Sequence, residues 1–86
     1  MNNKIYEIEN LATAREFLSS AHEKVIISNP EGSTRYYGMR VIDYMFTILQ
    51  REFPDKITGV IVNTYDDYAA FVTAKELGYE NINYVG

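Results

Sequence analysis

The chain has 86 residues, of which 47% are hydrophobic and 23% are charged, a composition that fits one small globular domain. It has no cysteine, which excludes disulfide scaffolds, thiolate zinc sites and cysteine catalysis. The net charge of −4 argues against nucleic-acid binding, because such domains usually carry a basic face. No apolar run approaches the roughly 18 residues of a membrane span, and we recognise no signal peptide. We therefore expect a cytoplasmic protein with neither nucleic acid nor a membrane as its partner.

The first half of the chain predicts two strands separated by a helix. The segment KIYEIE, residues 4–9, is short and alternates its apolar side chains, which is typical of a strand. Asn10 is a favourable N-cap, and apolar side chains then recur at helical spacing over residues 11–21. Thr13 and Glu16 also form a capping-box pattern, which would start the helix one turn later. The consecutive apolar residues Val25–Ile27 indicate a strand that is buried on both faces.

The longest predicted helix follows the loop after this second strand. Its N-terminus lies near Ser33–Arg35, and Pro54 ends it, because the residue before a proline avoids helical geometry. A single apolar stripe predicts its buried face. The stripe consists of Tyr37, Val41, Met45, Ile48, Leu49 and Phe53.

The rest of the chain predicts a strand, a third helix and a last strand. The segment ITGVIV, residues 57–62, indicates another buried strand. Thr64 is a suitable N-cap for the helix that follows, and Gly78 stands where a left-handed residue usually ends a helix. The segment INYV, residues 82–85, completes the chain as a fourth strand.

The order β-α-β-α-β-α-β predicts a single small α/β domain over residues 1–86, with four mostly parallel strands and three helices. Right-handed crossovers then restrict the topology. The strand order 1-2-3-4 would place every helix on one face of the sheet and leave the other face bare. We therefore favour the order 2-1-3-4, which covers both faces, although Glu7 is an unusual residue for a central first strand.

Ligands of open parallel sheets bind beyond the carboxyl ends of the strands, so three loops are candidates for a site. Glu9 and Asn10 follow the first strand, and the longest connection, NPEGSTRYYG, follows the second. This connection has the layout of a phosphate-binding loop but is not a Walker loop. Five residues separate Gly32 from Gly38, and no lysine follows the second glycine.

Two interpretations of this loop remain open. Free amide groups at the start of the second helix, beside Ser33, Thr34 and Arg35, provide an anion-binding or nucleotide-binding site, with Asn29 as a further ligand. Alternatively, Asn29, Ser33 or Thr34 caps the helix, and the proline and glycine of the loop only shape the turn.

Two acidic residues, Asp66 and Asp67, follow the third strand. They suffice chemically for a Mg²⁺ site, which needs one or two carboxylates and water. Acidic residues are also common in the first turn of a helix for electrostatic reasons alone. The only histidine, His22, lies at the end of the first helix, so we expect no histidine-based catalytic pair.

The eight tyrosines give a second kind of candidate site. Tyr36 and Tyr37 are adjacent, so only Tyr37 joins the apolar stripe of the second helix and Tyr36 points elsewhere. Tyr36 and Tyr65 both follow strands and belong to the same edge of the sheet. Exposed tyrosines are enriched at protein interfaces. Packing of these rings at the rim of the domain, with hydroxyls in water, is the alternative.

The layout of "IYEIENLATAREFLSSAHEKVIISN" and of "GVIVNTYDDYAAFVTAKELGYENINYV" resembles a STAS domain, the fold of anti-sigma-factor antagonists. The resemblance covers nearly the whole chain and implies, by analogy, a phosphorylatable serine at Ser33. The family's usual loop has an aspartate before the serine and a glycine after it, and EGST has neither. The family's first strand is also missing. The chain similarly looks like small uncharacterised bacterial α/β proteins, which implies no known activity.

Together these observations predict a non-enzymatic protein-binding or regulatory module without a cofactor. Its surface is the carboxyl edge of the sheet, with Arg35, Tyr36 and Tyr65 as contacts. The partner is another protein or a second copy of the chain, in a homodimer. The alternatives are the anion-binding or nucleotide-binding site at the second helix and a metal-dependent hydrolase that uses Asp66 and Asp67.

Overall fold

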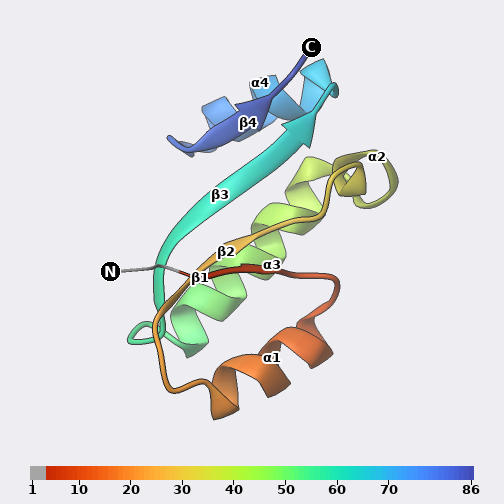
Figure 1. Ribbon diagram of the computed structural model, residues 1–86. Helices are drawn as coiled ribbons and strands as arrows, with labels where there is room; N and C mark the ends of the chain where they lie inside the picture. Colours follow the sequence, from red (N-terminus) through yellow and green to blue (C-terminus); the bar gives the residue numbers. More distant parts are fainter. Residues whose placement is uncertain (1–3) are drawn as a thin grey trace.

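Strands and helices alternate along residues 4–86, the part of the chain that the computed structural model describes (Figure 1). The predicted α/β domain with four parallel strands is confirmed. Among the described residues, no helix is both long and apolar enough to cross a lipid bilayer. The elements are β1 (Lys4–Glu7), α1 (Leu11–Ser20), β2 (Val25–Ser28), α2 (Ser33–Tyr37), α3 (Met39–Glu52), β3 (Ile57–Tyr65), α4 (Tyr68–Glu76) and β4 (Ile82–Tyr84).

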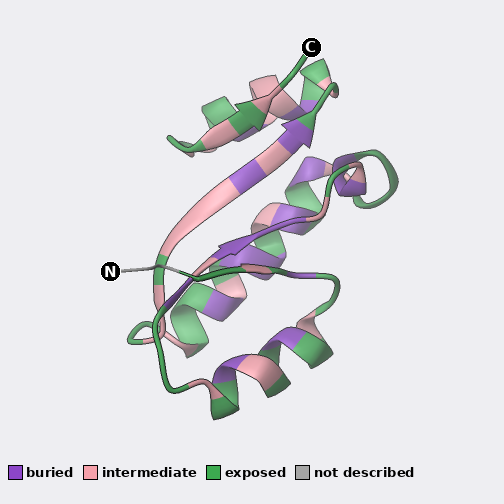
Figure 2. Cartoon of the chain, in the orientation of Figure 1, coloured by how far each residue is buried: buried purple, intermediate pink, exposed green. Residues whose placement is uncertain are grey.

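The strands of the sheet lie in the order β1-β2-β3-β4, so the predicted order 2-1-3-4 is wrong. The reason is the composition of β1, in which Lys4 and Glu7 are exposed. Charged side chains are typical of edge strands, where they hinder pairing with further chains. The more apolar strands β2 and β3 occupy the centre. Figure 2 shows the result, since β2 is mostly buried whereas β1 and β4 contain no buried residue.

The helices pack on one side of the sheet, and in the view of Figure 1 α3 and α4 lie behind the strands whereas α1 lies below β1. Ile27 and Val62 point into this helix layer and are completely buried. Residues at the alternate positions point the other way, and of these Ile5 is 57% exposed and Ile26 is half-buried. Neither belongs to the hydrophobic core. The other face of the sheet therefore has no covering layer of residues 4–86, which is unusual for a parallel sheet.

The predicted second helix is divided into α2 and α3, so four helices replace the expected three. Gly38 separates them with φ +85° and ψ 145°, a conformation that no helix contains. Because α3 begins only after this turn, its buried face differs from the predicted stripe, and Tyr37 and Val41 are 41% and 45% exposed. The buried residues of α3 are Met39, Ile42, Met45, Phe46 and Leu49.

Two of the predicted helix signals are confirmed and one is wrong. Asn10 caps α1 by accepting a hydrogen bond from the Thr13 amide at 2.9 Å. Gly78 has φ +96° and follows Leu77, the C-cap of α4. The predicted cap Thr64 instead lies within β3, which continues to Tyr65, and Asp67 caps α4.

Candidate functional site

The loop after β2 is joined to β3 through the side chain of Asn29, which is 1% exposed. Its Nδ2 donates to the backbone oxygen of Asn63 at 2.8 Å, and its Oδ1 accepts from the Asn63 amide at 2.8 Å. The amide side chain thus continues the backbone ladder between β2 and β3 beyond the last paired residue, Ser28. Nδ2 also donates to the Ser33 Oγ at 2.8 Å, so Asn29 fixes the start of α2 as well.

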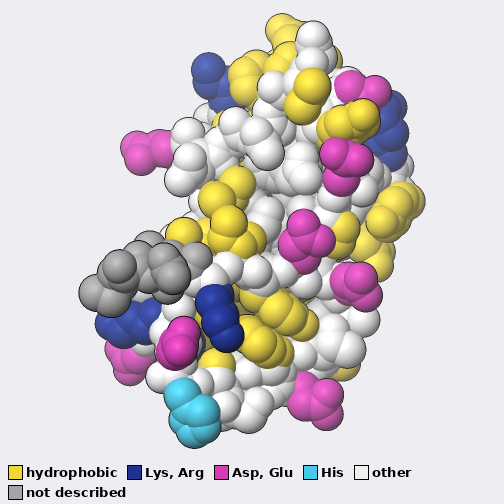
Figure 3. All heavy atoms as spheres, viewed as in Figure 1, with side chains coloured by type: hydrophobic (Ala, Val, Ile, Leu, Met, Phe, Trp, Pro, Cys, Tyr) yellow, Lys and Arg dark blue, Asp and Glu magenta, His cyan; other side chains and the backbone are white. Residues whose placement is uncertain are grey.

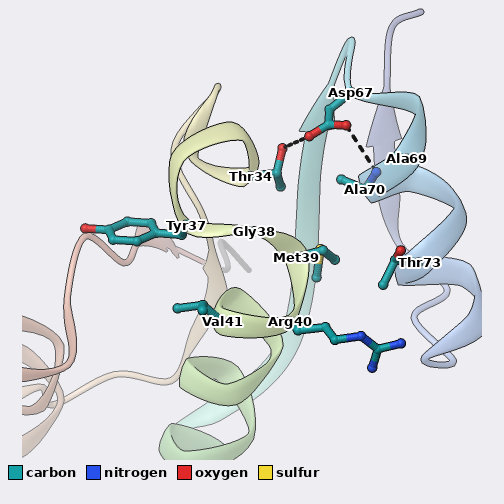
Figure 4. Close-up of a pocket in the computed structure, with 10 residues that line it drawn as sticks. All are labelled: Thr34, Tyr37, Gly38, Met39, Arg40, Val41, Asp67, Ala69, Ala70 and Thr73. Atoms are coloured by element: carbon teal, nitrogen blue, oxygen red, sulfur yellow. Dashed lines mark hydrogen bonds between the residues drawn. The ribbon is translucent and has the colours of Figure 1, made fainter.

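A second link connects α2 to α4. The Thr34 hydroxyl donates to Asp67 Oδ2 at 2.9 Å, and Asp67 Oδ1 accepts from the Ala70 amide at 3.2 Å (Figure 4). Asp67 therefore acts as the N-cap of α4 and holds α2 at the same time. A carboxylate at this position also interacts favourably with the dipole of α4.

A third link between the same loops lies at the surface. Arg35 donates through Nη2 to Asp66 Oδ1 at 2.9 Å and to the Asp66 backbone oxygen at 3.3 Å. The two side chains are 58% and 54% exposed, so water and salt screen the pair. The hydrogen bond and the charge of Asp66 raise the pKa of the Arg35 guanidinium. The guanidinium is consequently positioned over the loop after β3 rather than pointing freely into solvent.

The structure thus brings the predicted polar residues together, but as partners of one another. Ser33 and Thr34 are 1% and 4% exposed, and both hydroxyls take part in the hydrogen bonds described above. Asp66 and Asp67 face different partners, and residues 4–86 contain no group of three or more potential metal ligands. The anion site and the metal site both stay predictions.

His22 lies far along the fold from these loops. It follows the C-terminal end of α1 and lines a hollow with Lys4 and Val25, where β1 and β2 begin. The strands begin at the edge opposite to the carboxyl ends, so His22 is not part of the same site.

Tyr36 and Tyr65 are exposed at this edge, unlike the buried polar residues of the loop after β2. Tyr36 is 70% exposed and its ring meets that of Tyr37 edge-on, with centroids 5.1 Å apart. Tyr65 is 39% exposed and has φ +51°, the only left-handed backbone among the described residues other than glycine. Asn63 supports this turn, since its Oδ1 accepts from the Tyr65 amide at 3.1 Å. No ring contact joins Tyr36 to Tyr65 within the described chain.

Two hollows flank Tyr37. One, of about 300 Å³, lies between the start of α3 and α4, and Figure 4 shows Arg40 extending across it toward α4. The other, of about 290 Å³, is lined by Glu9, Pro30, Tyr36 and Tyr37. The sequence pattern does not predict this second hollow, because helical periodicity places Tyr37 in the core. The glycine at position 38 was the available signal, since a glycine between two helical segments often marks a turn.

The chain is similar to a protein of Rickettsia prowazekii (strain Madrid E) along almost its whole length. The two sequences are 51% identical over 84 residues, which cover 98% of this chain and 79% of the relative. That relative is described as the uncharacterized protein RP547, so it contributes no activity to the argument. No protein-family model and no solved structure matches the chain. By its similarity over nearly its full length, the chain belongs to the family of the uncharacterized Rickettsia protein RP547.

Proposed function

We propose that the protein is a non-enzymatic binding or regulatory module that recognises another polypeptide through the carboxyl edge of its sheet. One observation carries the proposal. The polar side chains of this edge bind one another, whereas Tyr36 stands 70% exposed among them. This large exposed ring lies on a loop that hydrogen bonds hold in place. It is therefore available to bury apolar surface against a partner.

The chemistry of tyrosine supports a polypeptide as the ligand. A tyrosine ring offers a large apolar area and one hydroxyl group, and it loses little conformational freedom on binding. The three links between the loops also order the edge before any partner arrives, which reduces the entropic cost of association. Tyr65 adds a second ring on a left-handed backbone, and such rare backbone conformations occur preferentially at functional sites.

The test is affinity capture from an extract of the source organism, with the retained proteins quantified by mass spectrometry. We expect Tyr36→Ala and Tyr65→Ala each to reduce the retention of the same partner. Tyr44→Ala is the matched control, because Tyr44 is 60% exposed in the middle of α3, away from the carboxyl edge. Equal retention by all three variants and the unchanged protein would contradict the proposal.

The resemblance to STAS domains adds a regulatory form of this proposal, in which Ser33 is phosphorylated. Its Oγ accepts a hydrogen bond from Asn29 and is buried, so a kinase would reach it only when the loop opens. A phosphate there would displace Asn29 and loosen the edge. We therefore expect Ser33→Asp to lower both the melting temperature and the retention of the partner, whereas an unchanged variant would argue against this form of regulation.

Anion or nucleotide binding at Ser33, Thr34 and Arg35 is the alternative function. The amide of Thr34 and the guanidinium of Arg35 are the donors that it would use first, because the amides of Ser33 and Arg35 already donate to the backbone oxygens of Pro30 and Gly32 at 3.0 and 3.1 Å. Millimolar phosphate or nucleotide should then shift the amide resonances of these three residues and raise the melting temperature. Resonances that stay unchanged would exclude it.

The partner is either a different protein or a second copy of the chain. Sedimentation over a range of concentrations separates these two cases, because only self-association changes the apparent mass as the protein is diluted. A homodimer whose formation depends on Tyr36 would make the partner a second copy of this chain.

A further inference from the structure

The smaller hollow at the carboxyl edge combines two kinds of wall. Tyr36, Tyr37 and Pro30 provide ring surfaces, and Glu9 provides a carboxylate, around a volume of about 290 Å³. Pockets for drug-sized ligands span roughly 300–1,000 Å³, so this volume suits a single side chain better than a cofactor. Glu9 is exposed and forms no salt bridge with another residue of the described chain.

The walls of this hollow are fixed in the free protein. The Tyr37 hydroxyl donates to the backbone oxygen of Glu9 at 3.1 Å, which joins the loop after β1 to the end of α2. The ring of Tyr36 rests against that of Tyr37 with the ring planes 60° apart. The two rings therefore present a face and an edge without a large rearrangement on binding.

The charge around the hollow is negative. The loops that follow the first three strands hold the acidic residues Glu9, Glu31, Asp66 and Asp67 and no base, and Arg35 lies beside them in α2. Arg35 is engaged by Asp66, so it does not neutralise Glu9. On the face shown in Figure 3, acidic side chains follow the right-hand side of the molecule, where the strands end.

We propose that this hollow binds the arginine or lysine side chain of the partner polypeptide. The inference rests on the proposed function, since it names the chemistry that the binding surface selects. A cation over the face of a tyrosine ring is attracted by the ring's quadrupole, and a carboxylate beside it adds a charge-assisted hydrogen bond. The long aliphatic part of either side chain covers Pro30 and the rings.

An uncharged apolar side chain fits the same volume less well. It would displace water from the carboxylate of Glu9 at the rim and would offer that carboxylate no hydrogen bond in exchange. An acidic side chain would meet like charge from Glu9 and from Glu31 in the next loop. Complementarity of charge and shape therefore selects a basic side chain.

The experiment is a titration of the isotope-labelled protein with N-acetyl-arginine amide, followed by the resonances of the Glu9 amide and the rings of Tyr36 and Tyr37. N-acetyl-citrulline amide, which has nearly the same shape and no charge, is the control probe. We expect shifts with the arginine probe only, and a loss of affinity of about 3-fold in Glu9→Gln. Glu31→Gln removes the same charge from the same edge without touching the hollow and should leave the affinity unchanged within about 1.5-fold.

A second measurement uses a random peptide library selected on the immobilised protein, with Tyr36→Ala as the counter-selection. Peptides that require Tyr36 should be enriched in arginine or lysine. Equal shifts with both amide probes, or retained peptides without that enrichment, would overturn the cation pocket while the binding surface stands. If no peptide requires Tyr36, the proposed function fails, and the inference fails with it.

Discussion

Asn29 connects the loop after β2 to β3 and to the start of α2, so in this structure it has a structural role and is not free to bind a ligand. In the sequence it is one of four candidate anion ligands, and in the structure each polar atom of its side chain faces another part of the chain. Its two bonds to Asn63 continue the pairing beyond Ser28, where the backbone ladder between β2 and β3 ends. We therefore expect Asn29 to stabilise the fold and not to bind a ligand.

The first prediction concerns this joint. Asn29→Ala leaves the amide and carbonyl groups of Asn63 without partners, so we expect the free energy of unfolding to fall by about 2 kcal/mol or more. Ser33→Ala removes only one acceptor, and Nδ2 of Asn29 keeps its bond to the Asn63 oxygen, so this change should cost about 1 kcal/mol or less. Urea denaturation measures both. Equal effects, or no effect of Asn29→Ala, would show that the residue is not a structural joint.

The second prediction concerns Tyr65, whose backbone conformation affects stability and whose ring is expected to affect binding. The left-handed backbone costs a tyrosine roughly 1–2 kcal/mol, and asparagine tolerates this conformation better. We expect Tyr65→Asn to leave the melting temperature unchanged or raise it, while the retention of a partner falls. A lower melting temperature together with full retention would mean that the ring serves packing only.

At the scale of elements, Gly38 explains why the candidate site differs from the one expected from the sequence. A continuous helix from Ser33 would have pointed its free amide groups at a ligand and buried Tyr37. The turn at Gly38 instead leaves α2 as a short segment and exposes Tyr36 and Tyr37 together. Most of the predicted apolar stripe lies within α3, but Tyr37 belongs to α2 and Phe53 follows α3, since periodicity alone does not reveal a single residue that interrupts a helix.

The third prediction tests this turn. A Cβ atom at Gly38 would meet nothing within 4 Å, so any cost of Gly38→Ala comes from the backbone conformation. We expect a loss of about 1–3 kcal/mol, since this region of φ and ψ is nearly restricted to glycine. Gly59→Ala is the control, because Gly59 lies in a strand without positive φ. A Cβ atom there would lie 3.9 Å from the nearest atom, Cγ1 of Ile26. Similar stabilities of the two variants in urea would contradict the account of the turn.

At the scale of the whole molecule, the sequence predicts the number and direction of the strands but not their order. Alternating strand and helix patterns depend on local periodicity, which each segment carries by itself. The order depends on which faces of the sheet are covered, and the rule that parallel sheets are covered on both faces favoured the wrong answer. Glu7 was the informative residue, because a charged side chain belongs at an edge. The proximity of the candidate polar residues followed from the fold class, whereas their mutual hydrogen bonds depend on side-chain geometry that no spacing shows.

The fourth prediction follows from the uncovered face. Ile27 lies on the covered side, and Ile27→Ala should cost about 2–5 kcal/mol. Ile5 lies on the uncovered side, and Ile5→Ala should cost less than about 1 kcal/mol. Urea denaturation at two protein concentrations measures both. A large cost of Ile5→Ala that depends on concentration would show that the second face is covered by another copy of the chain in solution.

We expect a polypeptide partner to bind the carboxyl edge and not the uncovered face of the sheet. Amide chemical-shift mapping tests it most directly, with the isotope-labelled protein titrated with a peptide retained in the library selection. We expect the largest shifts in residues 30–38 and 65–67. Largest shifts at Ile5, Ile26 and Ile61, on the uncovered face, would contradict it.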